Sequence, residues 1–509
     1  MKKRLLKTAC LLAAAALLLT GCRTEMPAGP AGLPGEAGSE EEPEVPLPSS
    51  FTLPYAPDQT LDPVTCADGM QQVVGSLLYE GLFRLDEQLQ PQPCLCQSYT
   101  YDPAALTYTF TLRSGVTFSD GSPLTAADAA AVLWRAKSSQ RYGARLSNAA
   151  DFSAGDGTLT VTLSSPDTGF PALLDIPIVK SGTEGSLVPV GTGPYVLSTA
   201  GEGAGLTARA DWWGGGGQPA ERIALAEARD RDAMLYLFSS HDVQLITADL
   251  IGTDPITATG NISYRDADTT VLHYVGFNVR RAPFSDIAVR RALGLGINRT
   301  TLASAVLSGH ARATQFPVSP VSPLYPDELE TLYSYDSFAE AMASAGLTSG
   351  QPRTATLLVN QENSFKVSAA EYIAEALSDF DLQIQVEALP WAEYTAALAA
   401  GDFDLYYGEV KLSANWDLTA LVGTGGALNY GGWSNTRTDQ LLAGLSSASD
   451  RAGAMAALCA HLDAQAPILP LCFSASSVLY QTGVLDGLTP TAAEPFYDLS
   501  SCRIHLREA

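Results

Sequence analysis

Short runs of alternating hydrophobic and polar residues recur along the chain, and turns or helical patterns separate them. Tyr108, Phe110 and Leu112 alternate with threonines, which predicts a strand at this point. The same period of two predicts further strands over 159–163 and 382–386. Strands and helices interspersed in this way indicate a mixed α/β protein with several lobes.

Helix-start signals accompany these strands. Thr125 is followed three residues later by Asp128, a capping-box pattern that predicts a helix beginning after Thr125. Residues 285–286 precede an amphipathic run, and Thr300 is expected to cap a further helix that ends near residue 309. Residues 367–379 also show helical periodicity, so a helix is predicted there.

Two glycine-containing segments are interpreted as structural. The segment 79–82 is typical of a helix end that is closed by Gly81. The segment 191–195 combines two permissive glycines with the φ-restricted Pro194, so a tight turn before a strand is predicted. Neither segment needs to contact a ligand.

The N-terminus has the pattern of an export signal. Four cations in residues 2–7 precede the apolar run 9–19, which as a helix covers about 16 Å, half of a ~30 Å bilayer core. The run ends in Leu19-Thr20-Gly21-Cys22, which resembles a bacterial lipobox. We therefore expect a lipoprotein signal peptide over 1–21 and diacylglycerol on Cys22; the alternative is an ordinary signal peptide with a chance cysteine.

Residues 22–50 differ in composition from the rest of the chain. Six prolines and six glutamates occur there without any aromatic residue, so this segment is expected to be a solvated acidic tether. The globular part is predicted to begin near Phe51.

Overall composition narrows the class of protein. The 509 residues are 46% hydrophobic and 17% charged, which is enough for a large core and about three domains. Acidic residues outnumber basic ones 55 to 30, and the formal net charge is −25. No basic run interleaved with aromatic residues offsets this charge, so nucleic acid is not expected as a partner.

Motifs of catalysis and of metal binding are missing from the sequence. There is no Gly-x-Ser-x-Gly elbow and no His-Glu-x-x-His, and the glycine clusters 214–217 and 423–426 lack a Walker lysine. The five histidines are scattered without zinc-ligand spacing. We therefore expect no enzyme, no cofactor and no bound metal.

Six cysteines remain once Cys10 leaves with the signal peptide and Cys22 is acylated. An extracytoplasmic location permits disulfides, and six cysteines allow fifteen pairings. We expect these residues to be structural or buried thiols, with the pairing left open. They are Cys66, Cys94, Cys96, Cys459, Cys472 and Cys502.

Six segments stand out when they are taken in order: 77–82, 108–113, 115–128, 189–195, 277–286 and 289–293. Together they resemble the family 5 extracellular solute-binding proteins of ABC importers. This family holds dipeptide-, oligopeptide- and nickel-binding receptors, and the resemblance runs from about residue 53 to residue 500.

The resemblance implies a type II periplasmic-binding-protein-like α/β fold, in which two lobes enclose a cleft and an extra domain is inserted in lobe I. Lobe I would comprise 51–85, 187–273 and 479–509, the inserted domain 86–186, and lobe III 274–478. The chain would cross between the lobes near 274–278 and 476–480, and the lobes would close over ligand by a hinge motion.

The resemblance also implies a function. The protein would be a lipid-anchored, extracytoplasmic, monomeric receptor that binds a peptide or peptide-like solute and delivers it to permease subunits in the membrane. A separate cytoplasmic subunit would hydrolyse ATP.

Ligand contacts are implied where the sequence matches the family. Backbone hydrogen bonds are expected from the stretch holding Gln72 and Val74, and Asn278 matches a family asparagine at the hinge. Further expected contacts are either carried over from the family or are aromatic and acidic residues close to those positions. They are Trp391, Tyr407, Glu409, Asn415, Trp416, Asp417, Tyr430 and Trp433.

One position departs from the pattern of the peptide receptors. Their ammonium-binding aspartate lies between an alanine and an aromatic residue, but here Asn415 occupies that place. A neutral amide forgoes a charge-assisted hydrogen bond worth roughly 1–3 kcal/mol. We therefore expect Asp417 or Glu409 to substitute, and the departure weakens a peptide assignment.

Three alternatives remain open. The same scaffold can serve as a sensory receptor that reports a solute without importing it, and a non-peptide solute such as a nickel complex is another possible ligand. A secreted hydrolase is the third alternative. Transport genes beside this one favour import, and turnover of a peptide or glycoside would favour the hydrolase.

Overall fold

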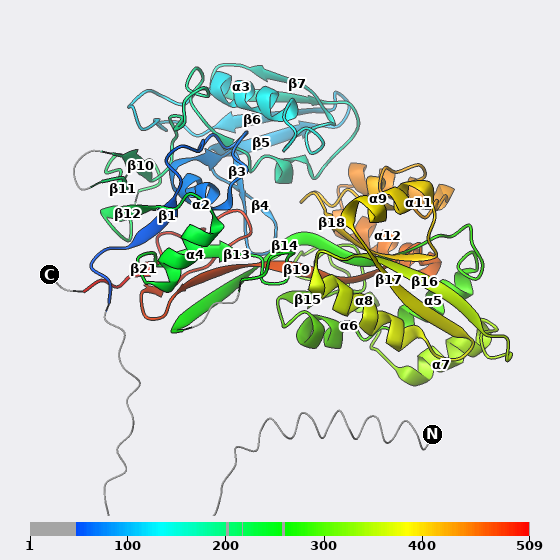
Figure 1. The fold of residues 1–509 in the computed structure, drawn as a ribbon. Coiled ribbons are helices and arrows are strands. Elements are labelled where there is room, and N and C mark those ends of the chain that lie inside the picture. The colour runs from blue at the N-terminus through cyan, green and yellow to red at the C-terminus, as the bar shows by residue number, and fades with distance from the viewer. Residues whose placement is uncertain (1–46, 200–202, 216, 257–259, 508–509) are drawn as a thin grey trace, which may run out of the picture. The chain divides into compact units, whose positions relative to one another are not determined.

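The computed structural model describes residues 47–199, 203–215, 217–256 and 260–507. The predicted signal peptide, Cys22 and the tether up to residue 46 lie outside these residues. Three sheets of four or more strands and three two-stranded pairs organise the described chain (Figure 1). The fold therefore belongs to the mixed α/β class that the sequence indicates.

The first sheet has the strand order β1-β12-β11-β10. Its strands are β1 (Thr52–Tyr55), β10 (Tyr195–Ser198), β11 (Gly205–Ala208) and β12 (Arg222–Glu227). β1 pairs with β12 in parallel, and the other pairs are antiparallel. Helix α2 (Gly69–Leu78) and helix α4 (Arg231–Ser239) belong to the same part of the chain. Asp68 caps α2 by accepting from the Gln71 N–H.

The second sheet lies between β1 and β10 in the sequence and has the order β5-β6-β8-β7. Its strands are β5 (Cys96–Asp102), β6 (Thr107–Leu112), β7 (Ala149–Ala154) and β8 (Thr158–Leu163), and helix α3 (Ala126–Lys137) packs against β7 and β8. Short elements flank this sheet: β2 (Glu80–Gly81), β3 (Phe83–Leu85), β4 (Pro91–Pro93), the 3-10 turn Phe170–Leu173 and β9 (Pro177–Ile178).

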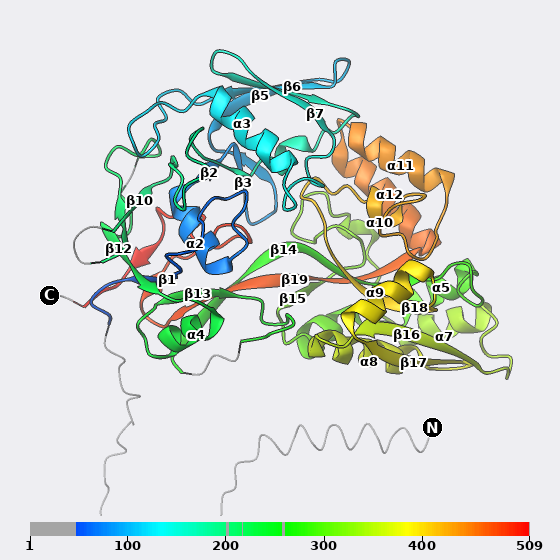
Figure 2. The same ribbon diagram turned by 45° about the horizontal axis from the view of Figure 1, so that its top comes forward.

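The third and largest sheet has seven strands in the order β13-β19-β14-β18-β16-β17, with β15 beside β19. Two of its strands are long: β14 (Ile262–Phe277) and β19 (Ile468–Gln481) pair antiparallel over most of their length and lie side by side in both ribbon views (Figure 2). The other strands are β13 (Leu245–Ala248), β15 (Ala311–Ala313), β16 (Arg353–Asn360), β17 (Leu382–Leu389) and β18 (Leu405–Lys411).

Helices cover both faces of this sheet. On one face the buried side chains of α5, α7 and α8 pack on Leu357 and Leu405, and on the other face those of α9, α11 and α12 pack on Leu358 and Tyr406. Neighbouring strand residues alternate between the two clusters, as the period of two requires. The helices are α5 (Ile287–Leu295), α6 (Arg299–Thr301), α7 (Tyr335–Ser344), α8 (Ser364–Leu377), α9 (Trp391–Ala400), α10 (Thr419–Val422), α11 (Thr436–Ser447) and α12 (Arg451–Gln465). The π turn Leu302–Val306, the 3-10 turn Asp327–Leu329 and the pair β20 (Leu485–Asp486) and β21 (Arg503–Ile504) complete the elements.

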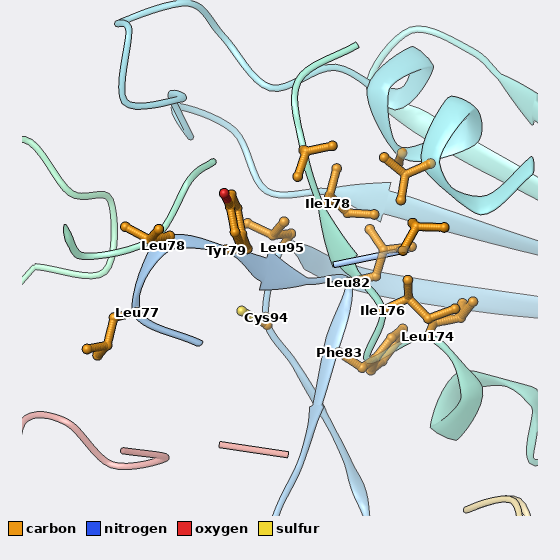
Figure 3. Packing of buried hydrophobic residues seen from close by; sticks show 14 of the residues in the cluster. Leu77, Leu78, Tyr79, Leu82, Phe83, Cys94, Leu95, Leu174, Ile176 and Ile178 are labelled. Carbon is orange, nitrogen blue, oxygen red and sulfur yellow. The ribbon is translucent and has the colours of Figure 1, made fainter. Parts of the chain in front are cut away.

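A separate hydrophobic cluster joins the first two sheets. Its buried side chains come from residues 51–245 and 478–502, and Figure 3 shows the part in which Tyr79, Leu82 and Phe83 lie beside Leu174 and Ile178. Apart from Leu89, which packs in a cluster of the third sheet, this cluster and the clusters of the third sheet are built from different segments, and β14 and β19 carry the chain between them.

Several predicted elements are confirmed. α3 begins after Thr125, whose hydroxyl and Asp128 form the capping box, and Asp286 caps α5 by accepting from the Ala288 N–H. The predicted strands coincide with β6, β8 and β17. The predicted turn before β10 is present, and Gly191 and Gly193 are needed there because a Cβ on either would collide with the backbone of Leu78.

Other predicted boundaries are wrong. Gly81 does not close a helix: α2 ends at Leu78, and Gly81 lies in β2, paired with Pro177. Thr300 does not cap a helix, because the cap is Asn298, two residues earlier, whose side chain accepts from the Thr301 N–H. The helix then continues into a π turn. α8 begins three residues before the predicted start, since Asn363 supplies its cap.

Two further features concern the class of protein. The six cysteines at residues 66, 94, 96, 459, 472 and 502 are all buried and unpaired, as the interpretation as buried thiols requires. Among the described residues, no helix has the length and apolar character needed to cross a membrane.

Candidate functional site

A cavity of about 1060 Å³ opens among the described residues. Its walls come from α2, from segments 141–148 and 164–177 beside the second sheet, from the middle of β14, and from the end of β18 with the loop after it. Residues 491–494 near the C-terminus complete the lining. This volume lies at the upper end of the range of small-molecule sites, and both polar and apolar atoms line it.

A break in the pairing of β14 with β19 shapes one wall. The register shifts between Asp268 and Leu272, and the residues in the break, Thr269, Thr270 and Val271, line the cavity. The Thr270 hydroxyl donates to the carbonyl of Leu412 at 2.6 Å, and the Thr269 hydroxyl donates to another strand carbonyl at 2.6 Å. The irregularity therefore turns strand residues toward the cavity without leaving their polar groups unsatisfied.

Asn415 lies at a corner of the cavity where segments far apart in the sequence meet. Its amide nitrogen donates to a carboxylate oxygen of Asp167 at 2.8 Å, and its amide oxygen accepts from the Ser413 hydroxyl at 2.6 Å. The Arg451 guanidinium donates to the backbone carbonyl of Asn415, and its Nη1 lies 3.9 Å from Oδ1 of Asp167. Asp167 is 6% exposed, and burial raises its pKa although the hydrogen bond from Asn415 opposes this. Neutral Asn415 is thus the partner of a carboxylate that another part of the chain supplies.

Asp417 adds a second carboxylate to this corner. It is exposed and lines the cavity, and one oxygen accepts from the Thr419 N–H at 2.9 Å, which leaves the other available. Its charge is close enough to contribute to the raised pKa of Asp167. The corner therefore carries two acidic groups, of which Asp167 has a nearby cation and Asp417 has none among the described residues.

Glu409 has a different environment. Lys366 of α8 approaches its carboxylate at 2.9 Å, and His273 approaches it at 3.3 Å. Burial raises the pKa of Glu409, but His273 in its protonated form and the charge and hydrogen bond of Lys366 outweigh this and lower it overall; at neutral pH His273 is neutral and Lys366 alone supplies the positive charge. Burial lowers the pKa of His273 to about 4, and its Nδ1 is 2.9 Å from the Tyr407 hydroxyl. Glu409 and Tyr407 are satisfied within this cluster and do not line the cavity.

Three of the eleven predicted ligand contacts line the cavity: Gln72, Asn415 and Asp417. Val74 and Trp416 are fully buried in hydrophobic clusters, where Trp416 packs edge-on against Phe473. The structure therefore places these two side chains in the core, because their neighbours in the sequence point to the cavity instead.

The remaining predicted residues lie elsewhere. The side-chain amide of Asn278 donates to the backbone carbonyls of Gly401 and Phe403, so it stabilises the turn before β18. Trp391 is 58% exposed at the start of α9 and stacks on a tyrosine of its own helix.

Two further aromatic residues pack within the third-sheet region. Tyr430 lies edge-on to Tyr406, and the Trp433 indole N–H donates to Thr438 at 3.3 Å. Neither lines the cavity, so their expected contact with a ligand has no support from their positions.

Sequence reasoning missed several residues of the cavity wall, among them Arg141, Arg145, Asp167 and Lys411. All four are charged groups outside the six matched segments. Arg141 and Arg145 occur four residues apart, which is the only local signal, and no local pattern connects them to the other two. In the described part of the chain, no group of three or more His, Cys, Asp or Glu side chains is arranged to hold a metal ion.

Comparison with known proteins defines the class. The family model described as bacterial extracellular solute-binding proteins, family 5 middle, matches residues 90–429. That is more than half of the chain, and the protein belongs to this family.

Individual relatives are more distant. The glutathione-binding protein GsiB of Escherichia coli (strain K12) is 25% identical over 428 residues, covering 75% of this chain and 80% of GsiB. The structure is similar to the unliganded open form of the periplasmic murein tripeptide binding protein MppA, with TM-score 0.74 and 20% identity over 90% of this chain and 98% of that one. It is also similar to a nickel ABC transporter structure from Bacillus halodurans, with TM-score 0.73 and 20% identity over 88% and 98% of the two chains. At these identities the structural likeness shows the fold, which is that of the type II binding proteins.

Proposed function

We propose that the protein is the extracytoplasmic substrate receptor of an ABC importer, and that it captures a peptide or peptide-like solute in the 1060 Å³ cavity. The observation that carries the proposal is the cavity itself. Its walls come from two parts of the chain, residues 61–177 and residues 269–494, and they hold charged groups of both signs. Membership of the solute-binding family supports it. GsiB is a glutathione-binding protein and MppA a murein tripeptide binding protein, which supports a peptide-like ligand; a nickel complex stays the alternative, since the nickel transporter structure is equally similar in fold.

The lobes are proposed to be 51–85 with 187–273 and 479–509, the inserted domain 86–186, and lobe III 274–478. The hydrophobic clusters support the separation of lobe III from the rest of the chain, whereas a single cluster joins lobe I and the inserted domain. β14 and β19 would form the hinge, and the contacts of Asp167 with Asn415 and of Thr168 with the Ser446 carbonyl would bridge the inserted domain and lobe III.

Asp417 is the proposed partner of the ligand ammonium. Glu409 is already neutralised by Lys366, whereas Asp417 lines the cavity without a cation of its own among the described residues. Asp167 would add attraction from the opposite wall. In this arrangement Asn415 does not bind the ammonium but orients Asp167.

Attachment to the membrane through lipid on Cys22, a monomeric state and the absence of catalysis complete the proposal. Cys22→Ala should move the protein from the membrane fraction into the soluble fraction. Retention of the variant in the membrane would overturn the lipid anchor without affecting the proposed binding.

The function is tested by native mass spectrometry of the full-length chain, purified without denaturation, followed by release and tandem sequencing of what it carries. Calorimetry with glutathione and with Ala-Ala-Ala accompanies it. Copurified peptides, or binding of either probe at micromolar or tighter affinity, would support a peptide receptor. One discrete non-peptide mass, with no binding of either probe, would overturn the peptide assignment.

The anchor is tested by Asp417→Asn. A charged hydrogen bond of ~1.5–3 kcal/mol corresponds to a tenfold to hundredfold loss of affinity for whichever of the two probes binds. Asp156→Asn, in an exposed turn outside the cavity, is the matched control and should bind as the wild type does. Unchanged affinity in Asp417→Asn would reject this anchor.

A further inference from the structure

Three cationic side chains line the cavity away from the acidic corner. Arg141 and Arg145 come from the turn segment after α3, and Lys411 is the last residue of β18. They reach the same cavity from segments that are distant in the sequence, in a protein whose formal net charge is −25. We call Arg141, Arg145 and Lys411 the basic wall.

Only part of this positive charge is compensated within the protein. Arg145 forms an ion pair with Asp175, and its Nε donates to the carbonyl of Leu173 at 3.0 Å. Arg141 donates to the carbonyl of Cys66, a neutral acceptor. Over the described residues, neither Arg141 nor Lys411 has a carboxylate within ion-pair distance, which leaves the basic wall with two uncompensated charges.

The three cations are close enough to repel one another. Burial lowers the pKa of Lys411, and the charges of Arg145 and Arg141 lower it further. Burial also lowers the pKa of Arg145 to about 10, and Arg141 adds to this while Tyr142 opposes it. Arg141 and Lys411 are exposed to solvent and Arg145 is half-buried, so solvent screens part of this repulsion. The like charges that remain gathered here still disfavour the empty protein, and an anion placed among them would relieve the repulsion.

Resting on the proposed peptide-receptor function, we propose that the basic wall binds the acidic end of the ligand, and that the preferred solutes are peptides or peptide-like molecules ending in an acidic residue. The two uncompensated charges match two carboxylates, a C-terminal one and a side-chain one. Arginine suits this role because its planar donors bind a carboxylate in a bidentate manner. The acidic corner at Asp417 would take the ammonium end, so the cavity is complementary to a zwitterion with net negative charge.

The experiment compares two isosteric probes, Ala-Ala-Glu and Ala-Ala-Gln, by calorimetry on the full-length chain in low-salt buffer. In the wild type we expect Ala-Ala-Glu to bind at least about tenfold more tightly, on the scale of one charged hydrogen bond. At least one of Lys411→Met and Arg141→Gln, the variant that removes the partner of the side-chain carboxylate, should reduce this ratio to below about threefold while changing the affinity for Ala-Ala-Gln much less. A variant that removes the partner of the C-terminal carboxylate should weaken the binding of both tripeptides alike, since both carry that group.

Arg229→Gln is the matched control. Arg229 pairs with Glu227 on the surface, its side chain is 80% exposed, and it does not line the cavity. This variant should keep the wild-type ratio, which separates a local contact from the effect of net charge. Thermal unfolding of each variant checks that the protein is folded, and Lys411→Arg, which keeps the charge, should retain the preference for Ala-Ala-Glu.

The outcomes separate this inference from the proposed function. If the wild type binds both tripeptides equally, or if the ratio persists in both variants, the basic wall is not the carboxylate site while the peptide receptor stands. If the wild type binds neither tripeptide while it carries copurified peptides or binds glutathione or Ala-Ala-Ala, the inference about the basic wall fails alone. If the protein also carries one discrete non-peptide mass and binds none of these probes, both proposals fail. Inorganic phosphate is titrated as a second probe, because phosphate and carboxylate share the oxyanion chemistry. Phosphate binding that Lys411→Met abolishes, without a preference for Ala-Ala-Glu, would identify a phosphate-bearing solute and overturn the acidic peptide.

Discussion

Glu409 and Lys411 lie two residues apart on β18, but only Glu409 has an oppositely charged partner among the described residues. Glu409 is held by Lys366 at 2.9 Å and by His273 at 3.3 Å, so its charge is compensated within the fold. Lys411 has no such partner among the described residues, and the charges that shift its pKa are those of the cations Arg145 and Arg141. The difference shows that abundance of charge on a strand does not identify a binding site. The informative group is the one that lines a cavity and lacks a counter-charge.

The largest effect is expected from acidifying the Glu409 cluster. The pKa of His273 is about 4 in the folded protein, below its ordinary value of 6.5, so the unfolded chain binds more protons between these values. The contribution of this pKa difference to the free energy of unfolding is therefore fully present above pH 6.5 and is lost as the pH falls toward 4. A shift of this size corresponds to about 3 kcal/mol. The lowered pKa of Glu409 acts in the same direction.

Urea unfolding at pH 7.5, 5.5 and 4 measures this loss. His273→Gln should flatten the pH dependence, even if it lowers stability at neutral pH. His505→Gln is the control, since His505 lies at an exposed site beside Asp486 and outside the cluster. An equal pH dependence in wild type and His273→Gln would show that the cluster is not the source of the acid sensitivity.

A smaller effect is expected from removing the cation of the Glu409 cluster. Lys366→Met leaves the carboxylate facing a neutral histidine, which in a fully buried pair costs about 3–5 kcal/mol. The Glu409 side chain is 37% exposed, so solvent screens part of the loss and we expect ~2 kcal/mol by urea unfolding. Adding Glu409→Gln should restore part of that stability. If the double variant is no more stable than Lys366→Met, the ion pair is not what stabilises this region.

The smallest effect, and one of opposite sign, is expected at the basic wall. Lys411→Met removes a cation that repels Arg141 and Arg145, so the empty protein should gain up to ~1 kcal/mol in urea unfolding. Stability gained together with ligand affinity lost is the pattern of a residue retained for binding. A loss of stability in this variant would mean that Lys411 serves the fold, and the comparison with Glu409 would lose its basis.

Local features of the molecule could be predicted from the sequence because they depend on neighbouring residues. The capping box of Thr125 and Asp128, the cap at Asp286 and the alternating strands all follow from contacts within a few positions. The prediction failed at Gly81, where a partner from a distant strand, Pro177, decides the backbone conformation.

The candidate site was predicted only in part, for the same reason. Gln72 lies just before the segment 77–82, Asn415 and Asp417 were carried over from the family resemblance, and all three line the cavity. Tyr407 and Glu409 occur in the matched region as well, but the side chains that satisfy them come from β14 and α8. The acidic partner of Asn415, Asp167, lies 248 residues away in the sequence.

The sequence by itself determined the family, the mixed α/β class, the acidic character and the approximate positions of most strands and caps, since these follow from local pattern and from motifs read in order. Only the tertiary structure decided which charges are neutralised and which remain free. Coulomb attraction depends on distance in space, and the folding of the chain brings Lys366 to Glu409 and Asp167 to Asn415 while it leaves Lys411 beside Arg141 and Arg145.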